Sequence, residues 1–208
     1  MTTAMTIRDA ASSRTGTDLL RIVRINEEIK RVVGVSFKIN IMALNAIFLA
    51  KRAGTAALGF GVLSNELRVF SQDLRACMES LTGLIHGCVN EVSLALQDIR
   101  FTGLLRQAVA LAPQDSSIAG VLQRREQDNE MHAQQLSRLR SQLKRALDDA
   151  FQMVELGGVL AKSAKIEAAY GQSFAGSLAQ VSGEFDGIVE EIRASLEALR
   201  RSAFFART

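Results

Sequence analysis

Residues 40–68 read NIMALNAIFLAKRAGTAALGFGVLSNELR, and this stretch decides the fold. A largely apolar run from Ile39 to Ala50 is followed by glycines at positions 54 and 59, after which a second apolar run begins. Glycine adopts a positive φ without steric cost, so glycines between two helical patterns favour a tight turn. The stretch therefore predicts the tip of a hairpin made of two helices.

Apolar residues recur at helical spacing on both sides of this tip, and again in the second half of the chain. Helices are expected at residues 17–52, 58–111 and 117–169, with a fourth ending near Ser202. Residues 112–116, around the single proline Pro113, form the expected linker, and residues 1–16 are expected to be a disordered N-terminal segment. The predicted fold is all-α, with long antiparallel helical hairpins forming a four-helix bundle of coiled-coil type.

The two hairpins, residues 17–111 and 117–208, read as copies of each other within one bundle. A shift of 118 residues aligns apolar positions of both helix pairs at once. It also aligns several identical residues, which are Ala46 with Ala164, Ala50 with Ala168, Ser64 with Ser182, Glu66 with Glu184, Arg75 with Arg193, and Glu79 with Glu197. Any two heptad patterns agree at about one shift in seven, so the agreement of both helix pairs favours an internal repeat.

The tip resembles one known family. The matching residues follow one another without a gap: Asn40, Ala43-Leu44-Asn45-Ala46, Ala50, Arg52-Ala53-Gly54, Gly59-Phe60, Val62, Glu66 and Arg68. In this order they resemble the hairpin tip of the methyl-accepting chemotaxis receptors. The resemblance is close over about residues 28–84 and looser over 161–199.

This resemblance implies an architecture and a set of partners. Receptors of the family build a four-helix bundle from two chains, each giving one hairpin, with the turns together at one end. Here one chain would supply both hairpins. The resemblance also implies partners, because the family's tip binds the coupling protein CheW and the histidine kinase CheA and packs receptor bundles together.

The first helix carries more apolar residues than one bundle-facing stripe requires. Val33, Phe37, Ile41, Leu44 and Phe48 lie beside the expected core stripe. Leaving several such side chains in water would cost several kcal/mol at roughly 25 cal/mol per Å². We therefore expect a partner or another copy to cover this region, unless a wider interior absorbs the surplus. The predicted partner-binding residues are Leu44, Ile47, Phe48, Leu49, Arg52, Gly54, Phe60, Glu66 and Arg68.

The tip also departs from the family pattern. Ile47 stands where family tips have alanine, Leu49 and Thr55 where they have glutamates, and Ala57-Leu58 where they have a Gly-Arg pair. These changes make the tip more apolar and remove charges that orient contacts in receptor arrays. They leave open whether the chain joins a standard kinase array.

The resemblance further suggests reversible methylation, which family members undergo at glutamate pairs flanked by small residues. Residues 186–195 nearly fit this spacing, with Asp186 as the misfit, so Glu190 and Glu191 are candidate methyl acceptors. Removing a charge there is expected to tighten the packing between helices. Acidic pairs on solvated helix faces are common, and a structural role is the alternative.

The sequence favours some classes of function over others. It lacks the Gly-rich, zinc-protease and nucleophile-elbow motifs of enzymes, so we expect no enzymatic activity. With 25 basic and 22 acidic residues and no basic run with aromatics, nucleic-acid binding is not expected. Cys77 and Cys88 lie about 16 Å apart on one helix, too far for a disulfide, which favours a cytoplasmic location. No signal peptide or membrane anchor is expected.

Two other classes of function stay open at this stage. The chain could be a scaffold or decoy that inserts among receptor bundles or serves another kinase pathway. It could also be a small-ligand or haem sensor built into a bundle core, although His86 and His132 are the only histidines and neither suggests a metal site. No cofactor is expected, and a homo-oligomer is a further possibility.

Overall fold

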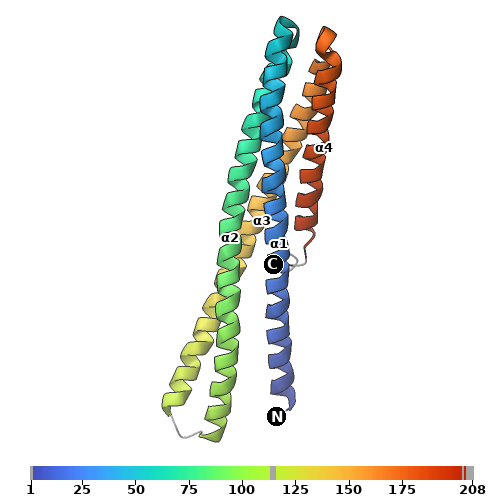
Figure 1. Ribbon diagram of the computed structural model, residues 1–208. Coiled ribbons are helices and arrows are strands. Elements are labelled where there is room, and N and C mark those ends of the chain that lie inside the picture. The colour runs from blue at the N-terminus through green and yellow to red at the C-terminus, as the bar shows by residue number, and fades with distance from the viewer. Residues whose placement is uncertain (1, 113–115, 203, 205–208) are drawn as a thin grey trace. The chain divides into compact units, whose positions relative to one another are not determined.

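The computed structural model describes residues 2–112, 116–202 and 204, with the backbone alone at 2–15 and 116. Every regular element of the described residues is helical (Figure 1). The long helices are α1 (Thr2–Ala53), α2 (Leu58–Leu111), α3 (Ser116–Ala168) and α4 (Ala175–Arg200). Two short 3₁₀ turns, η1 (Gly54–Ala57) and η2 (Gln172–Phe174), join α1 to α2 and α3 to α4. The predicted all-α hairpin bundle is confirmed.

The N-terminus differs from the expectation, because α1 begins at Thr2 rather than near residue 17. The sequence of residues 2–16 lacks proline, and its Ala, Met and Arg residues favour helix. A helix already formed at Thr17 extends toward the N-terminus at little cost, because each further residue adds a hydrogen bond without a new nucleation step. The segment expected to be disordered therefore continues the first helix.

Both hairpin turns use a residue in the left-handed region. Gly54 has φ of 68° and Gln172 has φ of 47°, and they are 118 residues apart, which is the offset of the predicted repeat. Glycine adopts this conformation freely, whereas glutamine does so at a cost. Sequence periodicity does not determine the turn position, so this agreement supports the proposed repeat independently of the heptad pattern.

The described chain forms two compact units, which we describe separately. The hairpin unit comprises Asn26–Thr82 and Lys144–Arg201 and contains both turns, which lie at the same end of it (Figure 1). In this unit α4 contacts α1 through Arg31 and Glu191, and α2 contacts α3 where the Cys77 thiol donates to the Ala146 carbonyl. The four helix segments thus surround one core.

Burial in the hairpin unit follows the 118-residue offset. Small and large apolar residues and one serine per hairpin are buried at matching positions. They are Ala43, Ala46, Ala50, Phe60, Ser64, Leu67, Leu74 and Leu81 in the first hairpin, and Ala161, Ala164, Ala168, Leu178, Ser182, Phe185, Ile192 and Leu199 in the second. We therefore propose that the two hairpins are copies of each other. Together they would form a four-helix bundle of the kind that two separate chains form in the receptors.

The terminal unit comprises Met1–Ile25, Gly83–Leu143 and Ser202–Thr208. Its interior includes charged side chains as well as apolar ones. Asp18 is buried and accepts hydrogen bonds from Arg21 at 3.0 Å and from Arg140 at 2.6 Å. The Arg140 guanidinium also lies 4.6 Å from the ring centre of Phe204, which is fully buried. These contacts join segments that are far apart in the sequence.

Candidate protein-interaction surface

Four large apolar side chains form an exposed stripe on α1 near its turn. Phe37, Ile41, Leu44 and Phe48 follow one another at steps of four, three and four, so they share one face of the helix. Their exposed fractions range from 38% at Leu44 to 64% at Phe48. We call these four residues the α1 stripe. The hairpin unit does not cover them with its own helices, as the sequence predicted for Phe37, Ile41, Leu44 and Phe48.

A shallow groove lies beside the α1 stripe, between α1 and α2. It has a volume of about 500 Å³ and is lined by Ile47, Ala50, Lys51, Gly54, Leu58, Gly61, Val62 and Asn65. Leu58 and Val62 are well exposed on its α2 side. A Cβ at Gly61 would lie 3.4 Å from the Ala50 side chain, which is an ordinary van der Waals contact. Lys51 is the only charged residue in the lining.

Four of the nine predicted partner-binding residues form part of this surface, which are Leu44 and Phe48 in the stripe and Ile47 and Gly54 in the groove lining. Leu44 and Phe48 are exposed on the stripe, Ile47 and Leu49 are half-buried, and Arg52 and Glu66 are exposed. Arg68 donates a hydrogen bond to Asn65 at 3.3 Å. No ion pair joins Glu66 to Arg52 or Arg68 in the described part of the chain. Gly54 provides the left-handed turn residue, which is a structural role.

Phe60 corrects the predicted site. Its exposed fraction is 0%, and it is among the largest fully buried side chains of the described residues. Phe60 occupies an inward-facing position of α2, matched by Leu178 in the second hairpin. It packs in the core and is not available to a partner. Only the family resemblance suggested a binding role for Phe60.

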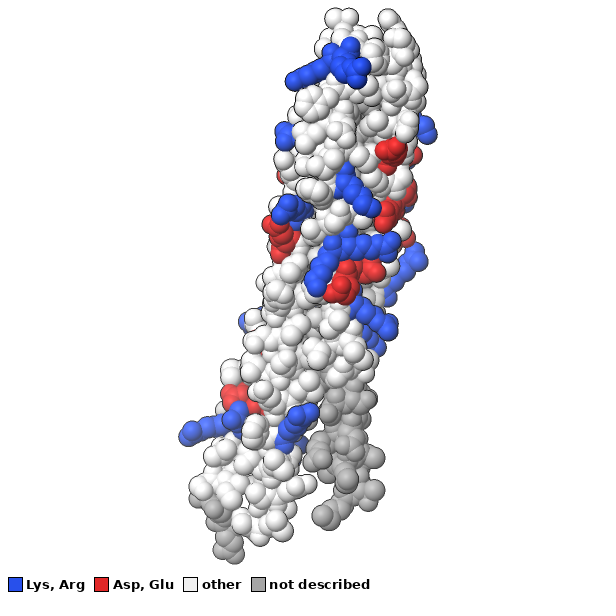
Figure 2. All heavy atoms as spheres, viewed as in Figure 1, with Lys and Arg blue, Asp and Glu red and all other residues white. Residues whose placement is uncertain are grey.

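The charged residues between Ile29 and Asn65 have one sign. Residues 29–65 contain five basic residues, Lys30, Arg31, Lys38, Lys51 and Arg52, and no acidic residue. In Figure 2 the end of the hairpin unit that carries the turns shows blue side chains on the visible face, whereas red ones appear further along. Lys38, Lys51 and Arg52 have no ion-pair partner among the described residues. The surface therefore combines exposed apolar groups with unpaired positive charge.

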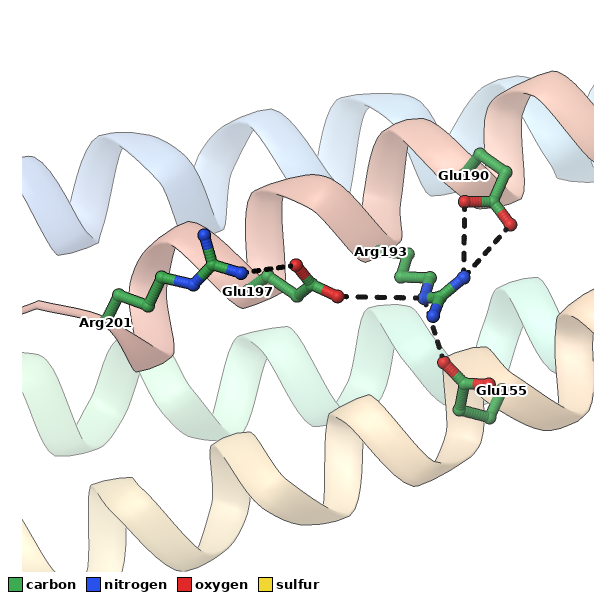
Figure 3. A network of polar contacts seen from close by, with 5 residues as sticks. All are labelled: Glu155, Glu190, Arg193, Glu197 and Arg201. Atoms are coloured by element: carbon green, nitrogen blue, oxygen red, sulfur yellow. Dashed lines mark hydrogen bonds and ion pairs between the residues drawn. The ribbon is translucent and has the colours of Figure 1, made fainter.

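Both candidate methyl acceptors lie on α4, and Glu190 takes part in a network of ion pairs around Arg193 (Figure 3). The Arg193 guanidinium lies 3.4 Å from the Glu190 carboxylate and 3.8 Å from the Glu197 carboxylate. Arg193 Nε also lies 3.0 Å from Oε1 of Glu155 on α3. That last contact lacks hydrogen-bond geometry, because Arg193 Nε has no hydrogen-bond partner. Glu190 is exposed, and Glu191 Oε1 lies 3.2 Å from Arg31 Nη2 of α1.

This arrangement changes the expected effect of neutralising Glu191. Glu191 forms an ion pair between α4 and α1, so removing its charge removes an attraction. The sequence had suggested that losing a charge would tighten the packing of the helices. Exposed ion pairs contribute about 0–1 kcal/mol, so the change would be small and of the opposite sign.

The thiols and histidines show no sign of a metal centre. No group of three or more His, Cys, Asp or Glu side chains is placed to hold a metal ion within the residues that the structure describes. Cys88 is buried, and burial raises the pKa of its thiol to about 11. Burial, and secondarily the charge of Asp149, also raise the pKa of Cys77. His132 contacts Glu91 at 2.7 Å in the terminal unit.

Among the residues that the structure describes, one helical stretch is long and apolar enough to cross a membrane. It lies within Gly16–Leu111 and contains an 18-residue window with a mean hydropathy of 1.8, of which 33% is buried. Core helices of soluble proteins pass the same test, so one such stretch is weak evidence. The expectation that the chain does not insert into a membrane stays a prediction.

Comparisons with known proteins find chemoreceptor-like sequences. The chain is 36% identical over 69 residues to methyl-accepting chemotaxis protein IV of Escherichia coli (strain K12), which is 33% of this chain and 13% of that protein. It is 28% identical over 68 residues to the putative sensory transducer protein YvaQ of Bacillus subtilis (strain 168), covering 33% of this chain and 12% of YvaQ.

The short length of these matches limits which properties of the relatives can be assigned to this chain. The aligned region spans about an eighth of their length. No family model and no solved structure matches the chain. The comparisons therefore support a chemoreceptor-like segment in about a third of this chain and a general role in chemotaxis-type signal transduction.

Proposed function

We propose that this protein is a non-enzymatic, cytoplasmic signalling module that binds a CheA-type histidine kinase, a CheW-type coupling protein or a receptor bundle. Binding occurs through the α1 stripe and the adjoining groove. The observation that carries the proposal is the exposure of Phe37, Ile41, Leu44 and Phe48 on one face beside a receptor-like turn. The chemoreceptor-like matches support the choice of partners.

The exposed area is large enough to matter energetically. Fully burying a Phe or Leu side chain contributes about 1.5–3 kcal/mol, so covering the exposed half of four such residues contributes roughly 4 kcal/mol. A micromolar complex requires about 8 kcal/mol. The rest of the binding free energy would come from two sources. One is the groove, which has Leu58 and Val62 on its rim, and the other is the group of unpaired cations.

Glu190 and Glu191 are proposed to adjust this binding rather than to form it. Both lie on α4. Glu191 forms an ion pair with Arg31 of α1, and α1 is the helix that carries the stripe. Esterifying Glu191 would remove that link and loosen the packing of α1 against α4. Incubation with a receptor methyltransferase and intact-mass measurement tests whether either residue accepts a methyl group, and a mass that stays unchanged contradicts this part of the proposal.

Phe48→Glu tests the main proposal. Phe48 is 64% exposed, so the substitution should leave the thermal unfolding temperature within a few degrees while abolishing capture of purified CheA-type and CheW-type proteins. Ile166→Glu is the matched control, because Ile166 occupies the corresponding position of the second hairpin and is also 64% exposed. The control should retain partner capture.

Other outcomes of this experiment distinguish the alternatives. If the wild-type chain binds receptors but neither kinase nor coupling protein, it acts as a scaffold or decoy. If it floats with lipid vesicles and Phe48→Glu does not, the stripe faces a membrane and the proposal is wrong. Equal loss of partner capture and of thermal stability in Phe48→Glu would mean that Phe48 belongs to the core.

A further inference from the structure

The second hairpin repeats the placement of the exposed residues of the first hairpin but not their apolar character. Six large apolar side chains of the first hairpin are exposed in the α1 stripe and on the rim of the groove. Under the 118-residue offset, the six corresponding residues are exposed as well. Two of them, Val159 and Ile166, are apolar, and they correspond to Ile41 and Phe48. The other four pairs are Phe37 with Glu155, Leu44 with Lys162, Leu58 with Gly176, and Val62 with Gln180.

The counterpart of the α1 stripe carries a charged residue at every second position. Glu155, Val159, Lys162 and Ile166 follow one another at steps of four, three and four, so they share one face of α3. Lys162 lies between the two apolar side chains along this face, which interrupts the stripe. An apolar partner surface placed there would cover both charges, and covering a charge without a new partner opposes binding.

The counterpart of the groove lacks an apolar rim. Gly176 and Gln180 of α4 stand at the positions of the two rim residues, Leu58 and Val62. Glycine has no side chain to bury, and an exposed glutamine keeps its amide in water. A charged and exposed residue, Lys165, stands at the position of an isoleucine of the groove lining. The second hairpin therefore lacks both parts of the surface that we propose for partner binding.

We propose that this chain is monovalent, so that each molecule binds one partner molecule through the α1 stripe and its groove and offers no second site. A bundle built from two identical hairpins presents every surface twice. The two hairpins of this chain differ at the residues that would bind, so only one of the two equivalent surfaces is functional. This valency rests on the function proposed above, because it concerns the same surface.

A single binding surface determines how the chain acts in an assembly. A molecule with two surfaces links two partners and gains avidity, whereas a molecule with one surface occupies a partner without adding another. The chain therefore ends a series of contacts instead of extending it. Where partner molecules are limiting, it lowers the number of partners that bundles with two surfaces can link.

Sedimentation velocity of the purified full chain with an excess of partner measures the number of bound molecules. The CheW-type coupling protein, the CheA-type kinase and a receptor bundle are tested in separate mixtures. At saturation the wild type should bind one coupling protein, one kinase subunit or one receptor bundle per chain. Raising the partner concentration further should not increase the mass of the complex.

A variant with a rebuilt second surface is the matched comparison. It copies five residues of the first hairpin onto the second, through Glu155→Phe, Lys162→Leu, Lys165→Ile, Gly176→Leu and Gln180→Val. All five positions are exposed, and nothing lies within 4 Å of a Cβ at Gly176, so the new side chains have room. The rebuilt variant should bind two partner molecules per chain, and adding Phe48→Glu should return the number to one. Circular dichroism verifies that the helix content is unchanged.

The outcomes that overturn the proposal differ from those that overturn the proposed function. Two partner molecules on each wild-type chain would show that the chain is not monovalent. A rebuilt variant that still binds one partner would show that the substituted residues do not cause the missing site. If neither the wild type nor the rebuilt variant binds any of the three partners, the proposed function is wrong and monovalency falls with it.

Discussion

The hairpin unit and the terminal unit bury different kinds of side chains. The hairpin unit fills its core with alanines, large apolar residues and serines whose hydroxyls donate to backbone carbonyls of the same helix, as Ser64 does to Phe60. The terminal unit buries Asp18 and Asp98, each paired with an arginine. A core without buried charge can use the same pattern of side chains in both hairpins. The buried ion pairs of the terminal unit instead hold particular segments against each other.

The difference concerns the placement of charge and not the apolar surface, because both units expose large apolar side chains, such as Phe48 in the hairpin unit and Leu104 in the terminal unit. In the hairpin unit the charged groups lie on the exterior. In the terminal unit arginines are used internally, since Arg140 contacts both Asp18 and Phe204. This comparison indicates that buried ion pairs hold distant segments of the chain together in the terminal unit, whereas apolar packing does so in the hairpin unit.

The largest expected effect is a loss of stability in the hairpin unit. Phe60→Ala removes a fully buried ring from its core and should lower the free energy of unfolding by about 3–5 kcal/mol. Phe37→Ala is the matched control, because Phe37 is exposed, and it should change stability by less than about 1 kcal/mol. Urea denaturation measures both. Similar losses in the two variants would show that the exposed stripe is part of the core.

A smaller effect is expected from breaking the charged core of the terminal unit. Asp18→Ala leaves Arg140, which is largely buried, without its closest acceptor, and should cost about 2–3 kcal/mol. Arg106→Ala removes the exposed pair with Glu126 in the same unit and should cost at most about 1 kcal/mol. Hydrogen exchange should show the Asp18→Ala losses within the terminal unit. Faster exchange chiefly around Phe60 would contradict the division of roles.

Several of these features could be predicted from sequence, and others could not. Heptad spacing and the glycines near position 54 predicted the helices and the first turn, and the surplus of apolar residues predicted the exposed Phe37 and Phe48. The role of Phe60 was assigned by resemblance, which does not distinguish an inward residue from an outward one. The Asp18, Arg140 and Phe204 cluster depends on tertiary contacts between residues that no local pattern connects.

Gly157 shows how the repeat is broken inside the core. It corresponds to the buried Ile39 of the first hairpin, and Phe70 corresponds to Ile188. A Cβ at Gly157 would lie 2.6 Å from the Phe70 ring, so the missing side chain makes room for that ring. A small residue facing a large one keeps the core filled. Periodicity in the sequence does not predict which side chain fills the space beside Gly157.

Gly157→Ala tests the packing of the hairpin unit's core, with a smaller expected change in stability. The added methyl group should displace the Phe70 ring and cost about 1–2 kcal/mol in spite of the better helix propensity of alanine. Gly183→Ala is the control, because nothing lies within 4 Å of a Cβ there, and it should stabilise the chain by about 0.5–1 kcal/mol. Thermal unfolding compares the two. Stabilisation by both substitutions would mean that the core beside Phe70 has spare room.

The smallest expected effect on the fold comes from the two thiols, one in each unit. Burial raises the pKa of Cys88 from 9.0 to about 11, so at pH 8 its thiolate population is about a hundredfold lower than in the unfolded chain. Cys77 is only half-buried, so it should be alkylated by iodoacetamide before Cys88. Mass spectrometry of labelled peptides follows both rates, with Cys77→Ser and Cys88→Ser as controls.

The pH dependence of this effect has a definite sign. A thiol whose pKa is raised by folding holds its proton more tightly in the native state, so its contribution to stability is complete below about pH 9 and is lost as the pH rises toward 11. Cys88→Ala should therefore flatten the loss of stability in that range, whereas Cys77→Ala should change it less. Faster alkylation of Cys88 than of Cys77 at pH 8 would show that the terminal unit opens more readily than the hairpin unit, because labelling would then follow local unfolding.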